Sequence, residues 1–164
     1  MKVMGFRAEK DAVHWAVLTG TVQAPVVLAH AKFEPVPAPS ESIWLAELRN
    51  GLLNLLEIHA PQRIGLHLIT AHAERPSTAK AFGNLLRRAR AEGIVMEIAQ
   101  TVVGKMLVLP DGQYVVNRPS RDCFLTSTGE RIQWNSLPSW SCRQSIMAAA
   151  ALLKSDDASI AEIL

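Results

Sequence analysis

The sequence of 164 residues has few of the features that mark several large classes of protein. Its two cysteines, Cys123 and Cys142, form neither a disulfide framework nor a Cys-x-x-Cys metal site, which favours a reducing, cytoplasmic location. No apolar run approaches the roughly 18 residues of a membrane span, and the first residues carry too much charge for a signal peptide. We therefore expect a cytoplasmic protein that does not associate with membranes.

The sequence also lacks the short motifs of common catalytic sites. It contains no P-loop, no Gly-x-Gly-x-x-Gly and no Gly-x-Ser-x-Gly pattern, so nucleotide hydrolysis and dinucleotide chemistry are not indicated. The formal net charge of +2 is too small to indicate nucleic-acid binding by itself. With 49% hydrophobic and 20% charged residues the composition is that of a globular protein, and the length fits one domain over residues 1–164.

The first third of the chain contains three segments with the pattern of short strands, at residues 2–7, 12–18 and 23–31. Only short turns separate them, so neighbouring strands must be antiparallel. Pro25 fits the entry of the third strand, because proline cannot donate a hydrogen bond to the interior of a sheet. This part of the sequence predicts an antiparallel meander.

Two helix and strand pairs follow the meander. Ser40 is a predicted N-cap for a helix from residue 41 to about residue 59, and residues 63–70 form the next strand. The apolar face of this helix is predicted to consist of Trp44, Leu45, Leu48, Leu52, Leu55 and Leu56.

A second predicted helix covers residues 77–92, ends at Gly93 as a C-cap, and leads into a fifth strand at residues 94–103. Its core face is predicted to consist of Ala79, Phe82, Leu85, Leu86 and Ala89. Lys80, Arg87 and Arg88, with Arg90 near them, lie on another face.

The stretch 107–138 has a different character and is interpreted as an insertion within the domain, either a β-hairpin or a long ordered loop. It contains turn signals at residues 110–112 and 126–129, and short strand patterns at 113–117 and 131–134. An alanine-rich helix at residues 141–153 and a short last helix at 158–164 follow it.

Local sequence at both ends resembles the RuvC-like Holliday-junction resolvases. Met4-Gly5-Phe6-Arg7, followed by His14-Trp15-Ala16-Val17-Leu18, resembles their first two strands, and residues 142–153 and 155–164 resemble their last two helices. The resemblance covers residues 2–105 and 141–164. It implies a ribonuclease-H-like α/β fold, with a mixed five-stranded sheet of three antiparallel strands and two parallel crossover strands, flanked by helices.

The resemblance also implies where metal-binding carboxylates should be. These resolvases cleave phosphodiesters with two magnesium or manganese ions held by several convergent acids. The first acid position, in strand one, is Arg7 here, and the second falls within residues 66–70, which offer His67 and no acid. At the final helix Asp156 or Asp157 remains. Two-metal nuclease chemistry is therefore expected to be absent.

The favoured hypothesis is a non-catalytic, RuvC-like domain without a cofactor that acts by binding. Its ligand would be branched or duplex DNA, or RNA, or a partner protein in a nucleic-acid-processing assembly. The residues proposed for phosphate contact are Arg7, Lys80, Arg87 and Arg88. Those proposed for a partner protein, together with the neighbouring Phe124 and Arg131, are Tyr114, Arg118, Arg121, Trp134 and Trp140. The alternative is that these groups are solvated surface arginines and aromatics folded back on their own core.

Two further hypotheses remain open. One is a magnesium- or manganese-dependent endonuclease with a displaced catalytic set, Glu9, Glu74 and Asp157, in which Asp156 and Asp157 bind the metal. The other is a structural homodimer formed through the leucine-rich helix at residues 41–59. A zinc site is not indicated, because His67 and His72 lack a metal-ligand spacing, although the fold could bring His14, His30 and Cys142 together.

Overall fold

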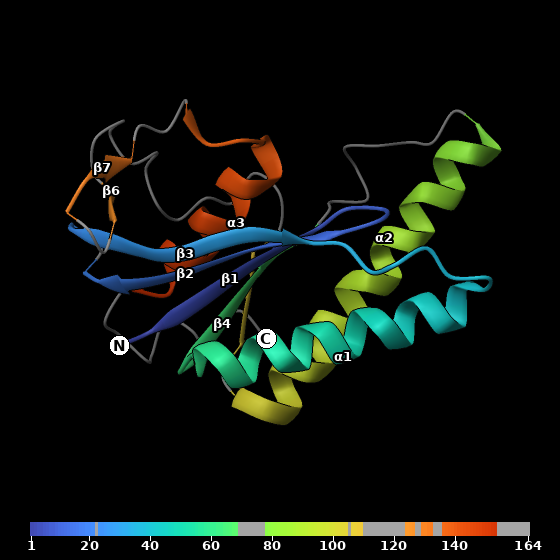
Figure 1. Cartoon of the computed structure of the whole chain (residues 1–164), viewed down its shortest axis with the longest axis horizontal. Coiled ribbons are helices and arrows are strands. Elements are labelled where there is room, and N and C mark those ends of the chain that lie inside the picture. The colour runs from blue at the N-terminus through green and yellow to red at the C-terminus, as the bar shows by residue number, and fades with distance from the viewer. Residues whose placement is uncertain are drawn as a thin grey trace.

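The computed structural model describes residues 1–21, 23–68, 78–104, 106–109, 124–126, 129–132 and 136–153. The strands are β1 (Val3–Ala8), β2 (Val13–Gly20), β3 (Pro25–Phe33), β4 (Arg63–His67), β5 (Met106–Leu109), β6 (Phe124–Thr126) and β7 (Arg131–Ile132). The helices are α1 (Glu41–His59), α2 (Ala79–Ile98) with the π-helical turn η1 (Ala99–Val103), and α3 (Trp140–Ala151). In Figure 1 the described strands form one sheet with α3 on one face and α1 and α2 on the other.

The sheet has the strand order β5-β4-β1-β2-β3-β6-β7. The antiparallel meander β1, β2 and β3 is confirmed, and β4 and β5 are added in parallel beside β1. The sequence interpretation of a mixed α/β sheet is thus confirmed, but the predicted number of five strands is wrong: the described sheet has seven, because β6 and β7 from the insertion join it beside β3. A β-hairpin within the insertion is confirmed as well, because β6 and β7 pair antiparallel, and β6 extends the sheet beyond β3. The predicted strand at 113–117 and the last helix at 158–164 lie outside the described residues.

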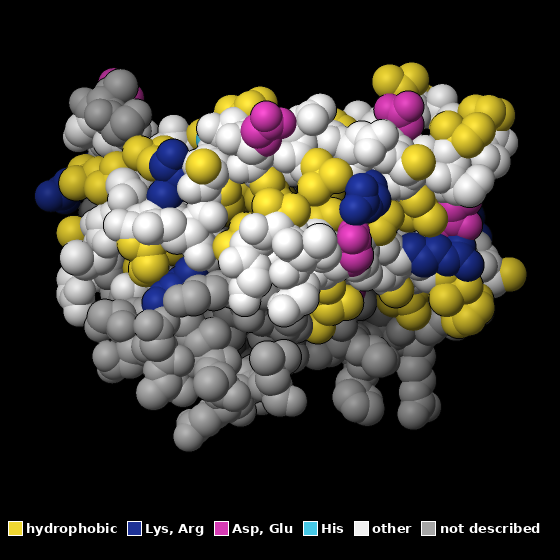
Figure 2. Space-filling model, turned by 90° about the horizontal axis from the view of Figure 1, so that it is seen from below, with side chains coloured by type: hydrophobic (Ala, Val, Ile, Leu, Met, Phe, Trp, Pro, Cys, Tyr) yellow, Lys and Arg dark blue, Asp and Glu magenta, His cyan; other side chains and the backbone are white. Residues whose placement is uncertain are grey.

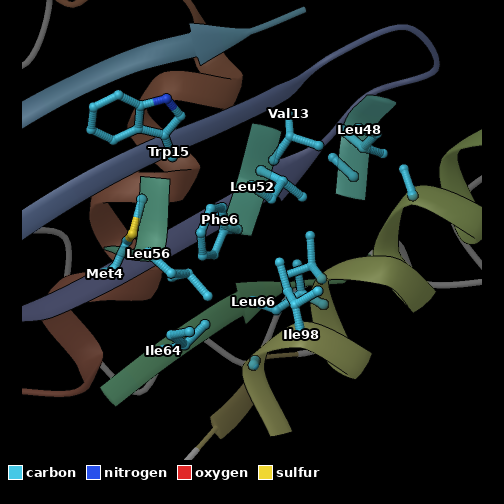
Figure 3. Packing of buried hydrophobic residues seen from close by; sticks show 14 of the residues in the cluster. Met4, Phe6, Val13, Trp15, Leu48, Leu52, Leu56, Ile64, Leu66 and Ile98 are labelled. Carbon is cyan, nitrogen blue, oxygen red and sulfur yellow. The ribbon is translucent and has the colours of Figure 1, made fainter. Parts of the chain in front are cut away.

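Helix α1 begins and ends where the sequence predicts. The Ser40 hydroxyl accepts a hydrogen bond from the Ile43 amide, as an N-cap does. Its apolar face packs against the sheet and contributes four buried side chains to the core beneath it. These four are Trp44, Leu48, Leu52 and Leu56. Figure 3 shows three of them, Leu48, Leu52 and Leu56, in the core that also holds Phe6 and Leu66. The proposed use of this face for dimerisation is therefore wrong, since the chain's own core occupies it.

The predicted end of the second helix is wrong. Helix α2 continues through Gly93 to Ile98, and residues 94–103 are helical rather than a strand. Ala91, Val95 and Ile98 have helical spacing and are all buried against the sheet, and this packing outweighs the β-branched composition of the segment. The fifth strand is β5, a few residues later, and it overlaps the start of the stretch assigned to the insertion.

The predicted core face of α2 is also wrong in its first half. Ala79, Phe82, Leu86 and Ala89 are exposed, and Phe82 keeps 51% of its accessible surface. The face that α2 buries lies further along the helix, at Ala91, Val95 and Ile98. The first half of α2 projects past the end of the sheet, beyond the described strands (Figure 1).

Helix α3 lies unusually close to the sheet, because two glycines face it. A Cβ atom built on Gly5 would lie 2.0 Å from the carbonyl oxygen of Ser145, and one on Gly65 would lie 2.4 Å from that of Ala148. The alanine-rich sequence of α3 provides the matching small surface. Gly5 and Gly65 therefore identify the sheet face that α3 covers. The strand residues on this face line the site described next.

Candidate functional site

The candidate site lies at the carboxyl ends of β1 and β4, on the sheet face that α3 covers. The parallel register places Gly5 beside Gly65, and Arg7 beside His67. Because side chains alternate between the two faces of a sheet, Arg7 and His67 project on the same side as the two glycines that contact α3. The register of β1 with β2 adds His14 next to Arg7.

Arg7 and His67 form a direct, buried contact. The Nη1 atom of Arg7 lies 2.7 Å from Nδ1 of His67 and 3.1 Å from the carbonyl oxygen of His67. Arg7 is 6% exposed and His67 is fully buried. A guanidinium has no acceptor atom, so Nδ1 of His67 must accept this hydrogen bond, and the ring carries its proton on Nε2. A fixed cation therefore occupies the end of β1.

Glu9 joins the turn after β1 to the start of α3. Its Oε1 atom accepts a hydrogen bond from the Ser141 hydroxyl at 2.5 Å and lies 3.4 Å from Nε2 of His14. Burial lowers the pKa of His14 from its ordinary value of 6.5, and the nearby Glu9 only partly opposes this effect. His14 is consequently neutral at pH 7, and Glu9 acts there as a hydrogen-bond acceptor.

His30 and Cys142 lie next to this group, between β3 and α3. The thiol sulfur of Cys142 is 3.4 Å from Nδ1 of His30. Cys142 is 2% exposed, and burial raises the pKa of its thiol. A buried, protonated thiol is a poor nucleophile, so this pair contributes hydrogen bonding and packing to the site wall.

The basic residues predicted on α2 lie away from this site, and three of them have partners within the chain. Arg87 Nη1 is 3.0 Å from Asp11 Oδ1, and its guanidinium stacks over Trp44. Arg88 pairs with Glu92 at 3.3 Å, and Arg90 pairs with Glu41. Lys80 is exposed at the start of the helix. In Figure 2, the basic and acidic groups of the described residues on the visible face are scattered rather than gathered into a basic band.

Several predicted site residues lie outside the described residues. These are Glu74, Tyr114, Arg118, Arg121, Trp134, Asp156 and Asp157. Among the aromatic residues proposed for a partner protein, Trp140 is described, and it is 50% exposed at the first position of α3. It directly precedes Ser141, so it lies at the edge of the candidate site.

The structure brings together side chains that the sequence offers little reason to combine. Sequence reasoning treats Arg7 and Glu9 separately and predicts only local hydrogen bonds for His67. Their common site depends on a parallel strand pairing between residues 60 positions apart and on a helix contact across 132 positions. One signal is present in the sequence: His67 lies within residues 66–70, where the family resemblance expects an acid and none is found.

The described side chains at the ends of β1 and β4, Arg7 and His67, do not fit a divalent cation. Arg7 offers no lone pair, and the Nδ1 lone pair of His67 is already used. Within the part of the chain that the structure describes, no three His, Cys, Asp or Glu side chains gather as metal ligands would. The same described part contains no helix long and apolar enough to cross a membrane.

No protein-family model matches the sequence, and no curated protein does. Solved structures match the fold closely. Thermus thermophilus RuvC in complex with Holliday junction substrate superposes with a TM-score of 0.64, at 12% identity, over 92% of this chain and 90% of that chain. The yeast mitochondrial Holliday junction resolvase gives a TM-score of 0.62 at 15% identity, over 99% of this chain and 84% of that one. The chain has the RuvC-like ribonuclease H fold.

A third solved structure with a similar fold is that of a viral protein. The Fowlpox virus resolvase, solved in complex with Holliday junction DNA, gives a TM-score of 0.54 at 10% identity and covers 94% of this chain and 99% of that chain. The match therefore extends along nearly the full length of a RuvC-like domain. Within this RuvC-like fold, Arg7 stands at the first strand position that the resemblance assigns to an acid, and beside it lies His67, from the region 66–70 in which the second acid is expected.

Proposed function

We propose that this RuvC-like domain binds branched DNA and does not cleave it by two-metal chemistry. The observation that carries the proposal is the buried contact between Arg7 and His67 at the ends of β1 and β4. A metal-dependent nuclease of this fold needs anions at that place, and this chain has a cation there.

The electrostatic argument concerns the position of Arg7. Two unit charges about 4 Å apart interact by about 4 kcal/mol at an effective dielectric constant of about 20, and a divalent ion doubles that repulsion. The guanidinium has no second role as a metal ligand, because it cannot be deprotonated in a protein. The guanidinium of Arg7 is buried and bonded to His67, so its part in the proposal is to replace a metal-binding acid rather than to contact a phosphate directly.

The choice of branched DNA follows from the neighbours of this fold. The Thermus thermophilus and Fowlpox virus proteins were each solved in complex with a Holliday junction, and this chain spans nearly the same length of fold. Among the basic residues predicted on α2, Lys80 is exposed at the start of the helix, whereas Arg87 and Arg88 form ion pairs within the chain. We therefore assign the first phosphate contact outside the site to Lys80.

The binding experiment compares a labelled four-way junction with duplex DNA and duplex RNA of the same sequence, by fluorescence anisotropy at low and physiological salt. We expect the junction to bind most tightly, with an affinity that falls steeply as salt is added. Lys80→Glu should weaken binding and reduce the salt slope. Lys2→Glu, the same charge change just before the start of β1, is the matched control and should have little effect. Absence of binding to all three ligands at low salt would overturn the proposal.

The cleavage experiment incubates the same junction with the protein and either magnesium or manganese. We expect no product. The competing hypothesis is a displaced carboxylate set of Glu9, Glu74 and Asp157, with Asp156 beside it. Metal-dependent cleavage that is lost in Asp157→Ala would establish that nuclease and refute the non-cleaving part of our proposal.

A further inference from the structure

Among the described tryptophans, Trp140 alone is exposed to solvent. Trp15 and Trp44 lie in the core, with 8% and 3% of their surface exposed, whereas Trp140 keeps 50%. An indole has a large apolar face and a single N–H donor, so an exposed one offers a flat surface to a ligand of similar shape. Trp140 is the first residue of α3, and the next residue, Ser141, bonds Glu9 at the candidate site.

The first turn of α3 directs this side chain outward. The Ser139 hydroxyl accepts a hydrogen bond from the Cys142 amide, which fixes the start of the helix. Successive side chains of a helix are about 100° apart, so Trp140 points roughly 200° away from Cys142. Cys142 is buried and contacts His30 on the sheet side. The indole therefore lies on the outer side of the turn whose next residue contacts the candidate site.

The charges at this edge of the site do not favour a phosphate next to Trp140. Glu9 presents a carboxylate with 44% of its side-chain surface exposed, and the neighbouring Lys10 pairs with Asp11 at 3.3 Å. Arg7 is buried and is not available to a ligand at the surface. A nucleobase carries no charge, and every base has a flat face that stacks on an aromatic side chain. The edge therefore suits a base better than the DNA backbone.

We propose that Trp140 stacks on an unpaired nucleobase at the branch point of bound DNA. This inference rests on the proposed function, the binding of branched DNA. In a paired duplex the neighbouring bases cover both faces of each base. A base without a partner can leave the stack at a much lower cost and lie against an aromatic side chain. Trp140 therefore distinguishes a branch point with an unpaired base from paired DNA.

The test compares two four-way junctions of the same sequence, one with a single unpaired base at the branch point and one with an abasic residue in its place. We expect the full chain to bind the first about tenfold more tightly by fluorescence anisotropy, as is typical of one stacked base. Trp140→Ala should lose this preference, and Trp140→Phe, which keeps an aromatic ring, should retain most of it. Phe82→Ala removes an aromatic side chain of similar exposure, 51%, from a helix on the other face of the sheet, and this control should retain the preference.

The salt dependence separates this contact from a phosphate contact. A stacked base releases no counterions, so Trp140→Ala should lower the affinity by the same factor at every salt concentration, whereas Lys80→Glu should reduce the salt slope. Trp140 is half-exposed, so circular dichroism should show folded variants.

The outcomes separate this inference from the function on which it rests. A native chain that binds both junctions equally, or a Trp140→Ala chain that keeps the preference for the unpaired base, would overturn the inference alone. In that case the indole faces a different ligand, such as a partner protein. Absence of binding to either junction at low salt would overturn the proposed function and this inference together.

Discussion

Arg7 and His67 lie side by side on the parallel strands β1 and β4, with Nη1 of the arginine 2.7 Å from Nδ1 of the histidine. The pair is buried on the sheet face that α3 covers, and the arginine also bonds the histidine carbonyl oxygen. The two strand ends are thereby held together by side chains as well as by the backbone ladder. This contact has consequences for stability, metal binding and the shape of the site.

Removing the arginine should destabilise the fold. Arg7→Met keeps a long side chain but leaves Nδ1 and the carbonyl oxygen of His67 without this donor in a buried place, which should lower the free energy of unfolding by about 2 kcal/mol or more. Urea denaturation measures this loss. Arg49→Met, which breaks an exposed pair with Glu97, is the control and should cost far less. Equal losses in the two variants would refute the role assigned to the buried pair.

Restoring acids at these two positions should create metal dependence. In Arg7→Asp combined with His67→Asp, two neighbouring buried carboxylates repel each other unless a cation lies between them. We expect the double variant to melt at a lower temperature than the native chain and to regain several degrees when manganese is added. The native chain should show no such rise. A double variant that is folded but insensitive to manganese would show that these positions do not correspond to the acid positions of the family.

Stability should decrease as the pH falls through the range where histidine protonates. Burial lowers the pKa of His14 below 6.5, and burial followed by the charge of Lys2 lowers the pKa of His59. The unfolded chain then binds protons more readily than the folded one, so the free energy of unfolding is highest above about pH 6.5 and falls below it. His14→Gln should flatten this dependence in unfolding curves at several pH values. An unchanged pH profile in that variant would assign the effect to other groups.

Two glycine substitutions should have opposite effects. Gly5→Ala places a Cβ atom 2.0 Å from the Ser145 carbonyl oxygen and should cost about 3 kcal/mol or more, because the α3 backbone must move away. Gly93→Ala lies within α2 with nothing within 4 Å of its new Cβ, and it should stabilise the protein by about 0.5 to 1 kcal/mol. Thermal denaturation of both variants tests these signs. Destabilisation by Gly93→Ala would indicate that the helix ends there after all.

The sequence is a good guide where structure depends on neighbours along the chain. Short turns imply the antiparallel meander, and Ser40 marks the start of α1. The same local reasoning predicts a strand at residues 94–103, because β-branched residues are common in strands and glycine is common at helix ends. That prediction is wrong. There the contact of Val95 and Ile98 with the core decides the structure, and a one-dimensional pattern does not contain that contact.

The candidate site is predicted only in part for the same reason. The sequence identifies Arg7 as a cation at a position where the family resemblance expects an acid. Its burial, its bond to His67 and the contact of Glu9 with Ser141 all depend on how distant segments meet. Periodicity cannot supply the register of a parallel strand pair, since it describes each strand alone.

The close approach of α3 to Gly5 and Gly65 has a further consequence for how the site works. If α3 slid along the sheet, its side chains would have to pass over strand backbone with no space to receive them, so the helix has a single allowed position. The wall of the site that carries Trp140, Ser141 and Cys142 is therefore preorganised by the core. A ligand that binds against this wall does not have to order the backbone of the wall, so that part of the usual cost of binding is small.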